Sequence, residues 1–266
     1  MTAKNYFKHQ EVKILKKNWE SPDTVTFRVD WQAKHDPGQF VEISIPGIGE
    51  SPISFCSWNP QYCEFNVRVV GNVTKAISRL EEGETMTIRG PYGRGYPMDY
   101  FKDNHMLFIG GGCGVAPLKG IIEYVDHHRE QYKDVDIFMG YRSRDDILFK
   151  HLLDEWEEKF NIHVTIDKDA GEYHYHCPVG FVTDQVKNSD ISPANKLVFI
   201  CGPPIMMEKT IPLLLQKGFH EDQIWVSAER HMKCCTGKCG HCMINGKYAC
   251  KDGPVFRYDE IKGVTE

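Results

Sequence analysis

The sequence of 266 residues lacks the features that mark several special classes of protein. It has no apolar run approaching the roughly 20 residues that a membrane-spanning helix needs, so we expect no membrane span. It has no internal repeat and no low-complexity tract, which argues against solenoids and disordered linkers. Residues 1–6 contain no apolar signal core, so we expect a cytoplasmic protein.

Positive charge is not in excess either. Lys and Arg number 32 against 37 Asp and Glu, and the formal net charge of −5 argues against general nucleic-acid binding. The apolar fraction of 41% and the charged fraction of 26% are ordinary for a globular protein. The length allows two modest domains. Ten cysteines without a secretion signal indicate a reducing compartment and metal or redox use.

Cysteines concentrate near the end of the chain. Cys234, Cys239 and Cys242 have the spacing C-x4-C-x2-C, and Cys250 follows. This is the spacing of plant-type [2Fe–2S] centres, in which thiolates hold the irons. Counting from Cys235 leaves only three residues before Cys239, so Cys235 is expected to be a surplus thiol and not a metal ligand.

The residues between these cysteines suit a tight loop. Gly237 and Gly240 can adopt backbone angles that other residues avoid. Asn245-Gly246 is typical of a hairpin turn, which would bring Cys250 back toward the loop. A structural zinc site remains an alternative, although zinc prefers two CxxC-like pairs and only one occurs here. Disulfides are a third alternative, weakened by the absence of a secretory signal.

The first hundred residues alternate between apolar and polar side chains, as half-buried antiparallel strands do. Strands are expected at residues 24–29, 41–45, 65–69 and 85–88. One short helix is expected at about 74–80. Short strands with one helix predict a small closed barrel over residues 1–100.

After residue 103 the pattern changes to short, continuous apolar runs, as in buried parallel strands. Strands are expected at 106–109, 135–139, 162–166, 197–200 and 224–226, with helices at 118–125, 147–160 and 205–216. Alternating strands and helices predict a parallel α/β domain over residues 101–229. The glycine-rich turn at 110–117 would present backbone amides and a helix N-terminus to a diphosphate.

A second turn, Cys201-Gly202-Pro203-Pro204, follows a strand at the carboxyl edge, where such sheets bind ligands. Taken alone, Cys201 is also compatible with a free cysteine buried in a strand. The stretch at residues 174–177, His-Tyr-His-Cys, could suggest a metal site, but a surface loop is the better interpretation.

Four motifs occur in a fixed order in the first domain: Pro37-Gly38-Gln39-Phe40, Ser51-Pro52-Ile53-Ser54, Gly71-Asn72-Val73-Thr74 and Gly90-Pro91-Tyr92-Gly93. With the two turns of the second domain, they resemble the ferredoxin–NADP reductase superfamily. The second motif departs from the family pattern Arg-x-Tyr/Phe-Ser/Thr, because Ser51 and Ile53 stand at the Arg and aromatic positions. Other donors, such as backbone amides and Thr74 near the Gly71 turn, must then hold the flavin diphosphate.

The resemblance implies an antiparallel FAD-binding barrel, a parallel NAD(P)-binding α/β domain and a small [2Fe–2S] module over residues 230–266. FAD contacts are implied at Pro52, Ile53, Ser54, Val69, Gly71, Val73, Thr74, Gly90, Tyr92 and Gly93. Nucleotide contacts are implied at Gly111, Gly112, Gly114, Ala116, Pro117, Gly202 and Pro203. Cys201 would be the catalytic residue beside the nicotinamide, and the metal ligands would be Cys234, Cys239, Cys242 and Cys250.

The order of these parts resembles reductase subunits that pass electrons from NAD(P)H through FAD and a [2Fe–2S] cluster to partner redox subunits. A nicotinamide gives up two electrons at once and the cluster carries one, so the flavin must stand between them. Residues 224–227 and 252–256 look most like the corresponding electron-transfer subunit of anaerobic sulfite reductase. The gamma subunit of sulfhydrogenases and the electron-transfer subunit of dihydroorotate dehydrogenase are alternatives, and a zinc-bearing structural module is the non-enzyme alternative.

Charges give two further expectations. Arg142 and Arg144 follow the second strand of the nucleotide domain, where a 2′-phosphate could bind, but Asp145 and Asp146 would oppose it. With the resemblance, this favours NADH over NADPH. Residues 230–250 contain four Lys and Arg and no Asp or Glu, which predicts a cationic docking face around the cluster that includes Lys238 and Lys247.

Overall fold

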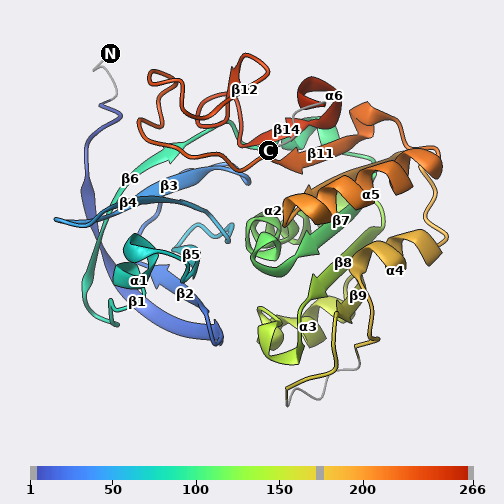
Figure 1. Cartoon of the computed structure of the whole chain (residues 1–266), viewed down its shortest axis with the longest axis horizontal. Coiled ribbons are helices and arrows are strands. Elements are labelled where there is room, and N and C mark those ends of the chain that lie inside the picture. Colours follow the sequence, from blue (N-terminus) through green and yellow to red (C-terminus); the bar gives the residue numbers. More distant parts are fainter. Residues whose placement is uncertain (1–4, 172–176, 263–266) are drawn as a thin grey trace.

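The computed structural model describes residues 5–171 and 177–262. An N-terminal sheet and a second, α/β part lie side by side, and the C-terminal segment crosses above both of them (Figure 1). No helix among the described residues is both long and apolar enough to cross a bilayer. Most of the His-Tyr-His-Cys stretch, residues 174–176, lies outside the described ranges.

The N-terminal sheet is antiparallel throughout, with the strand order β4-β3-β6-β1-β2-β5. Its elements are β1 (Gln10–Ser21), β2 (Thr24–Val29), β3 (Phe40–Ile45), β4 (Gly49–Ser54), β5 (Cys63–Arg68), α1 (Asn72–Ile77) and β6 (Thr85–Tyr92). Within the described ranges the outer strands β4 and β5 have no ladder between them, and only an isolated bridge joins Phe55 to Phe65. The predicted closed barrel is therefore corrected to a curved antiparallel sheet. Pro52 on β4 has no amide hydrogen to donate, which suits an edge strand.

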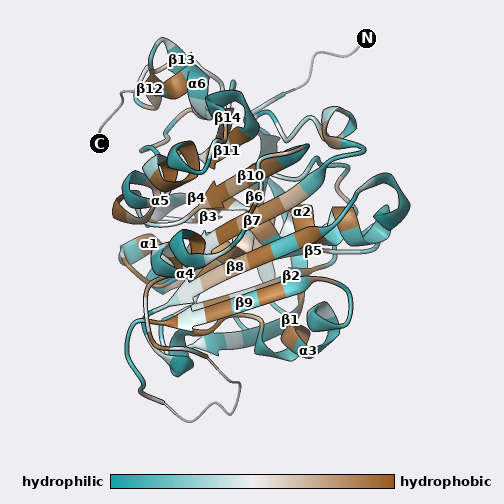
Figure 2. Cartoon of the chain, turned by 90° about the vertical axis from the view of Figure 1, so that its right-hand side faces the viewer, coloured by the Kyte–Doolittle hydropathy of each residue, from teal (hydrophilic) through white to brown (hydrophobic). Residues whose placement is uncertain are grey.

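The second sheet has the order β14-β11-β10-β7-β8-β9. Its strands are β7 (His105–Gly111), β8 (Val135–Tyr141), β9 (Asn161–Ile166), β10 (Lys196–Cys201), β11 (Ile224–Ser227) and β14 (Val255–Arg257). The first five are parallel, as predicted, whereas β14 pairs antiparallel with β11. Apolar residues colour the middle of these strands, between more hydrophilic helices (Figure 2).

The helices of this part are α2 (Val115–His127), α3 (Lys150–Glu157), α4 (Val182–Asn188) and α5 (Pro204–Gln216). Single 3₁₀ turns lie at Met98–Phe101, Gly112–Gly114, Arg129–Gln131, Arg144–Asp146 and Glu221–Gln223. The helix expected from residue 147 begins only at Lys150, because Phe149 has a left-handed φ of 55° that interrupts it. The sequence did not predict α4, which is short and largely polar.

The C-terminal segment is packed against both other parts. It contains β12 (Met243–Ile244), β13 (Lys247–Tyr248), β14 and α6 (Tyr258–Ile261). Cys235, Cys242 and Cys250 belong to one buried cluster that also includes Phe40 of the N-terminal sheet and Met206 of α5. The cysteine-rich segment therefore shares its core with the elements that it crosses.

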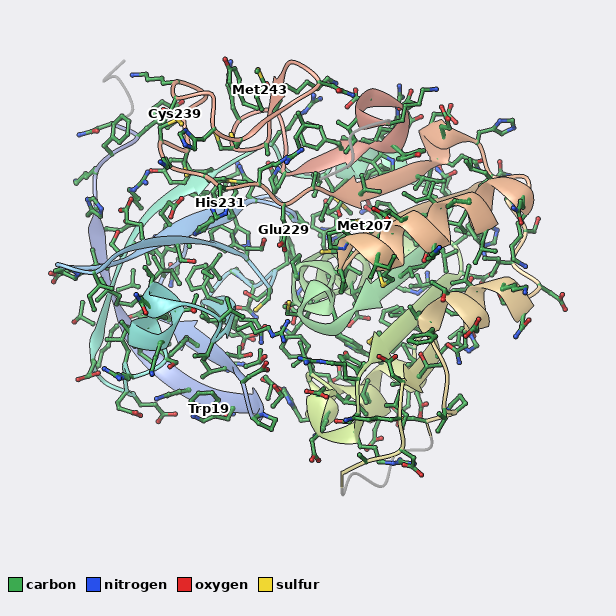
Figure 3. All side chains as sticks on the ribbon, in the orientation of Figure 1. Trp19, Met207, Glu229, His231, Cys239 and Met243 are labelled. Carbon is green, nitrogen blue, oxygen red and sulfur yellow. The ribbon has the colours of Figure 1, made fainter. Side chains whose placement is uncertain are left out.

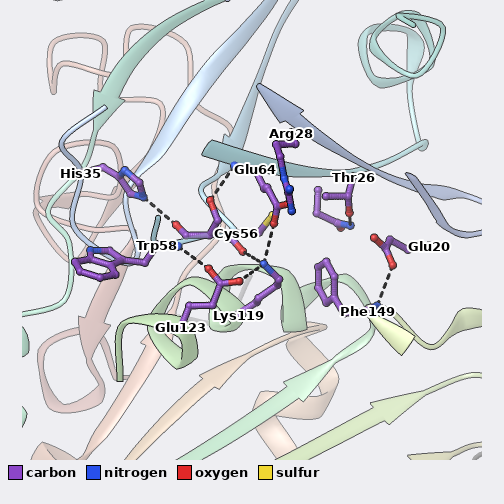
Figure 4. A network of polar contacts seen from close by, with 12 residues as sticks. Glu20, Thr26, Arg28, His35, Cys56, Trp58, Glu64, Lys119, Glu123 and Phe149 are labelled. Atoms are coloured by element: carbon purple, nitrogen blue, oxygen red, sulfur yellow. Dashed lines mark hydrogen bonds and ion pairs between the residues drawn. The ribbon is translucent and has the colours of Figure 1, made fainter. Parts of the chain in front are cut away.

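A buried polar network joins the N-terminal sheet to α2 (Figure 4). The Lys119 ammonium group, whose side chain is 3% exposed, donates to the Cys56 carbonyl at 3.0 Å and to Glu64 at 2.8 Å, and also pairs with Glu123. Glu64 is held from its own sheet by Arg28 at 2.8 Å. Although burial works against ionisation, Lys119 keeps the pKa of Glu64 below its usual range. These contacts fix the two parts relative to each other.

Candidate functional site

A cavity of about 660 Å³ lies between the N-terminal sheet and the carboxyl ends of the parallel strands. The predicted nucleotide residues Gly111, Gly112, Gly114, Gly202 and Pro203 line it. The structure thus brings the two turns together, as expected for the carboxyl edge of a parallel sheet.

These two turns are packed backbone against backbone. A Cβ atom on Gly114 would lie 2.4 Å from the Cys201 carbonyl oxygen, and one on Gly202 would lie 3.0 Å from the Gly111 amide nitrogen. Gly112 has a φ of +53° and nothing within 4 Å of its missing side chain. Gly114 and Gly202 are therefore needed for the close approach of the two turns, and Gly112 leaves the backbone open at the predicted diphosphate position. Ala116 and Pro117 lie in the first turn of α2 and do not line the cavity.

Cys201 ends β10 and is 2% exposed. The cavity-lining residues do not include it, because it lies behind the wall that Gly114 and Gly202 form. Burial raises the pKa of its thiol well above the usual range. Cys201 is therefore a neutral thiol in the wall, and its role beside the nicotinamide stays a prediction.

Four cavity-lining residues of the N-terminal sheet were not predicted: Ser21, Asp23, Thr24 and Arg68. Arg68 ends β5 and pairs with Asp23 at 3.0 Å. It supplies a positive charge at the cavity that Ser51, at the Arg position of the usual motif, lacks. No local pattern marks Arg68, because β5 and the glycine-rich turn meet only through packing of the two parts.

The predicted flavin residues fall into two groups. Pro52, Ile53 and Ser54 lie on edge strand β4, which packs against α1 near Val73. Val69 and Gly71 lie in the loop that leads from β5 to α1.

The Thr74 hydroxyl is already engaged, because it accepts hydrogen bonds from the Val70 and Gly71 amides at 3.0 Å. The hydroxyl also donates to the Gly71 carbonyl at 3.2 Å, so it shapes the turn, and its contact with the flavin diphosphate stays a prediction.

The second group faces the C-terminal segment. The Tyr92 hydroxyl accepts a hydrogen bond from Arg89 at 2.9 Å and donates to the Tyr6 carbonyl. A Cβ atom on Gly93 would lie 2.6 Å from the Gly253 carbonyl oxygen, and Gly90 packs against Tyr92. In this structure these residues join the N-terminal sheet to the cysteine-rich segment.

Two acidic residues of the α/β part also line the cavity. Asp146 and Asp167 line it just beyond the carboxyl ends of β8 and β9. Arg142 also lines it, 3.8 Å from Asp23. Burial raises the pKa of Asp167, and the Arg142 charge works against this shift. Phe181, 59% exposed, adds an aromatic face to the lining. The position of Asp167 directly after a parallel strand was the signal that could have identified it.

The cysteine loop curls as its glycines predict. Gly237 and Gly240 have φ values of 70° and 79°. β12 and β13 pair around Asn245 and Gly246, both with positive φ, so the predicted hairpin is confirmed. Cys239 is exposed at the outer rim of the molecule, above the N-terminal sheet (Figure 3).

Backbone amides point at three of the four predicted ligand sulfurs. The donors are the Gly237 amide to Cys250 at 3.3 Å, Lys238 to Cys234 at 3.3 Å, Cys239 to Cys234 at 3.4 Å and Cys250 to Cys242 at 3.5 Å. Burial opposes ionisation of Cys234, but amide donation outweighs it and lowers the pKa of this thiol to about 6. Burial and the neighbouring Cys242 raise the pKa of Cys250 to about 12.

Cys235 faces away from this arrangement. Its buried thiol donates to Glu42 Oε1 on β3 at 2.7 Å. Burial and Glu42 raise its pKa far above the usual range. Burial also raises the pKa of Glu42 to about 7. A protonated thiol bound to a carboxyl group is a poor metal ligand.

The donor set fits an iron–sulfur cluster. Amide hydrogen bonds to sulfur are the interactions that stabilise thiolate-bound clusters. None of the ten cysteines, all within the described ranges, forms a disulfide. Among the described residues, no group of three or more His, Cys, Asp or Glu is gathered closely enough to hold a single metal ion.

Comparison with known families finds three matching domain models along the chain. Residues 11–96 match the oxidoreductase FAD-binding domain, and residues 108–211 match the oxidoreductase NAD-binding domain. Residues 229–262 match the iron–sulfur cluster binding domain of dihydroorotate dehydrogenase B. The protein is therefore an oxidoreductase that binds FAD, a pyridine nucleotide and an iron–sulfur cluster.

The chain belongs to the ferredoxin–NADP reductase family of oxidoreductases. It is 40% identical to sulfhydrogenase 2 subunit gamma of Pyrococcus furiosus, over 84% of this chain and 83% of that protein. It is 35% identical to a probable dihydroorotate dehydrogenase B (NAD(+)) electron transfer subunit of Methanocaldococcus jannaschii, over 93% and 89% of the two chains. The structure of an NADH-dependent reduced ferredoxin-NADP oxidoreductase superposes with a TM-score of 0.76 at 27% identity, covering 98% and 91%.

Proposed function

We propose that this chain is the electron-input subunit of a larger redox complex, accepting electrons from NADH at the cavity and delivering them at the cysteine loop. One observation carries the proposal: the cavity and the loop with the exposed Cys239 belong to one packed unit. The two named relatives are subunits by name, which supports the proposal that electrons pass from this chain to another subunit.

The residues of the chain would bind and orient the nucleotide, the flavin and the cluster, and would shield them from water. The backbone at Gly111–Gly114 would receive the nucleotide diphosphate, and Arg68 would bring positive charge to the flavin side. Cys234, Cys239, Cys242 and Cys250 would hold the cluster. When bound, the nucleotide supplies a hydride, the flavin accepts two electrons and the cluster carries one at a time.

The partner is proposed from the relatives. The two named relatives are subunits of a sulfhydrogenase and of dihydroorotate dehydrogenase B. They carry the names of the two alternatives and not that of a sulfite reductase, so they favour a hydrogenase-type or dihydroorotate-type partner over the sulfite reductase that residues 224–227 and 252–256 first indicated. Ten unpaired cysteines suit a reducing compartment, and we propose the cytoplasm.

The same cavity favours NADH. Asp146 and Asp167 can accept hydrogen bonds from a ribose diol, and their charges oppose a 2′-phosphate. Arg142 lies toward Asp23, and Arg144 pairs with Asp169 at 2.7 Å. The two arginines that could have favoured NADPH thus have carboxylates beside them.

The test is chemical analysis of the purified chain. We expect one FAD and two irons per chain, and NADH should reduce the flavin and the cluster, which absorbance and electron paramagnetic resonance report separately. Stoichiometric zinc with little iron or flavin would refute the proposal and would favour the structural module.

A further inference from the structure

Arg89 is a buried cation beneath the cysteine loop. It lies on β6 and is 3% exposed. Its Nη2 atom donates to the carbonyl oxygen of Lys233 at 3.2 Å, and Lys233 directly precedes Cys234. Its Nη1 atom donates to the Tyr92 hydroxyl at 2.9 Å. Burying a guanidinium group is costly unless it is paired, so this position needs an explanation.

Its partner is Glu50 on β4. Nε of Arg89 contacts both carboxylate oxygens at 2.9 and 3.0 Å, and Nη2 contacts Oε2 at 2.5 Å. Ser44 and His9 also contact this carboxylate, at 2.5 and 2.9 Å. β4 is the strand that carries the predicted flavin residues 52–54. One ion pair therefore links the flavin-binding edge strand to the start of the cluster loop.

The pair is charged at neutral pH. Hydrogen bonding from Arg89 outweighs burial and lowers the pKa of Glu50 to about 2. Burial works against the charge of Arg89, but Glu50 and Tyr92 raise its pKa further above the usual range. Glu42 also lies close, since both Arg89 and Glu50 act on the pKa of its carboxyl group. Arg89 also lies at the start of the loop itself, because its Nη2 atom reaches the carbonyl oxygen of the residue that directly precedes Cys234.

We propose that Arg89 positions the cluster loop and raises the reduction potential of the cluster, with Glu50 as the counter-charge that limits this effect. A fixed positive charge favours the more negative, reduced form of a cluster, and it acts strongly where water is excluded. Burial of Arg89 and its bond to the Lys233 carbonyl place this charge against the loop. The inference rests on the proposed function, and in particular on its ligand set of four cysteines.

The experiment is a redox titration of the cluster in the purified full chain, followed by electron paramagnetic resonance. We expect Arg89→Gln to shift the potential to more negative values, because the cation is lost. Glu50→Gln should shift it to more positive values, because Arg89 loses its counter-charge. The double variant should return near the wild-type potential. A merely structural role would move both single variants in the same direction.

Arg89→Lys separates charge from geometry, since lysine keeps the charge but not the planar fork. We expect its potential to lie closer to wild type than that of Arg89→Gln. The matched control is Lys159→Gln. Lys159 forms surface ion pairs with Asp126 and with Glu155 of α3, so its loss should not shift the potential. An unchanged potential in an Arg89→Gln protein that retains its cluster overturns the inference.

Iron content is measured for every variant. If Arg89→Gln loses the cluster, Glu50→Gln decides alone: a positive shift supports the inference, and no shift or a negative shift overturns it. Absence of iron from the wild-type chain would instead contradict the proposed function, so the two failures are distinguishable.

Discussion

Cys234 and Cys235 are adjacent in the chain but lie in opposite environments. Amides of the loop donate to the Cys234 sulfur, whereas the Cys235 thiol is buried against Glu42. The left-handed φ of 57° at Cys235 turns the two side chains apart. One residue of difference thus separates the proposed metal ligand from a buried thiol that is bound to a carboxyl group.

We expect Cys234→Ala to abolish the visible absorbance of the cluster, because one iron loses a ligand. Cys239→Ala, Cys242→Ala and Cys250→Ala should behave in the same way. Cys235→Ala should retain iron at the wild-type ratio. Iron analysis and absorbance of the five purified variants make the comparison. Loss of the cluster in Cys235→Ala alone would show that the ligand register starts one residue later.

The second prediction at this scale concerns the nucleotide. Replacing Asp146 and Asp167 together by Asn removes two negative charges from the cavity lining. We expect the ratio of kcat/KM for NADPH over NADH to rise about tenfold, equivalent to about 1.4 kcal/mol. Steady-state reduction of an artificial acceptor measures it. A strong NADPH preference in the wild-type chain would contradict the assignment of these carboxylates.

At the scale of elements, two turns that follow different strands together form one wall of the cavity. The glycine-rich turn after β7 and the turn after β10 approach closely enough that Gly114 touches the backbone at Cys201 and Gly202. Parallel strands end at the same edge of the sheet, so turns far apart in sequence become neighbours. The cradle depends on both turns and on the absence of a side chain between them.

Gly114→Ala should therefore weaken nucleotide binding. The new Cβ atom would lie 2.4 and 2.5 Å from the carbonyl group of Cys201, and backbone must move to accept it. We expect KM for NADH to rise at least about tenfold, a cost of about 1.4 kcal/mol or more. Iron content in the same preparation serves as the control, because the predicted cluster ligands do not line the cavity. An unchanged KM would mean that the turn can shift without cost.

At the scale of the whole molecule, Lys119 is the main polar link between the N-terminal sheet and α2 that Figure 4 displays. Removing one partner of a buried ion pair leaves uncompensated charge behind. We expect Lys119→Met to lower the free energy of unfolding by about 3 kcal/mol. Lys159→Met, at a half-exposed surface pair, should cost less than about 1 kcal/mol. Urea unfolding compares them, and equal effects would show that the network is not structural.

The docking face is also a property of the whole molecule. Lys238 lies in the loop beside the exposed Cys239 and over the ring of Phe7, 5.8 Å from its centre. Lys247, expected to act with it, is instead paired with Glu260 at 3.0 Å. Lys238→Glu should slow electron transfer to the partner subunit, most clearly at low salt, because surface charges steer association. Lys187→Glu, on α4, is the control. Equal transfer by Lys238→Glu and wild type at every salt concentration would place the docking face elsewhere.

Features that depend on neighbouring residues could be predicted from the sequence alone. The cysteine spacing, the Asn245-Gly246 hairpin, the glycine-rich turn and the parallel alternation all follow from residues within one turn or strand of each other. Features that depend on distant residues became visible only in the folded chain. It paired β14 with β11, brought Arg68 to the cavity, directed Cys235 to Glu42 and, within the described ranges, left the N-terminal sheet without a closing ladder. These contacts arise from packing between segments up to 193 residues apart in the sequence. A local sequence pattern contains no information about which distant segment it will contact.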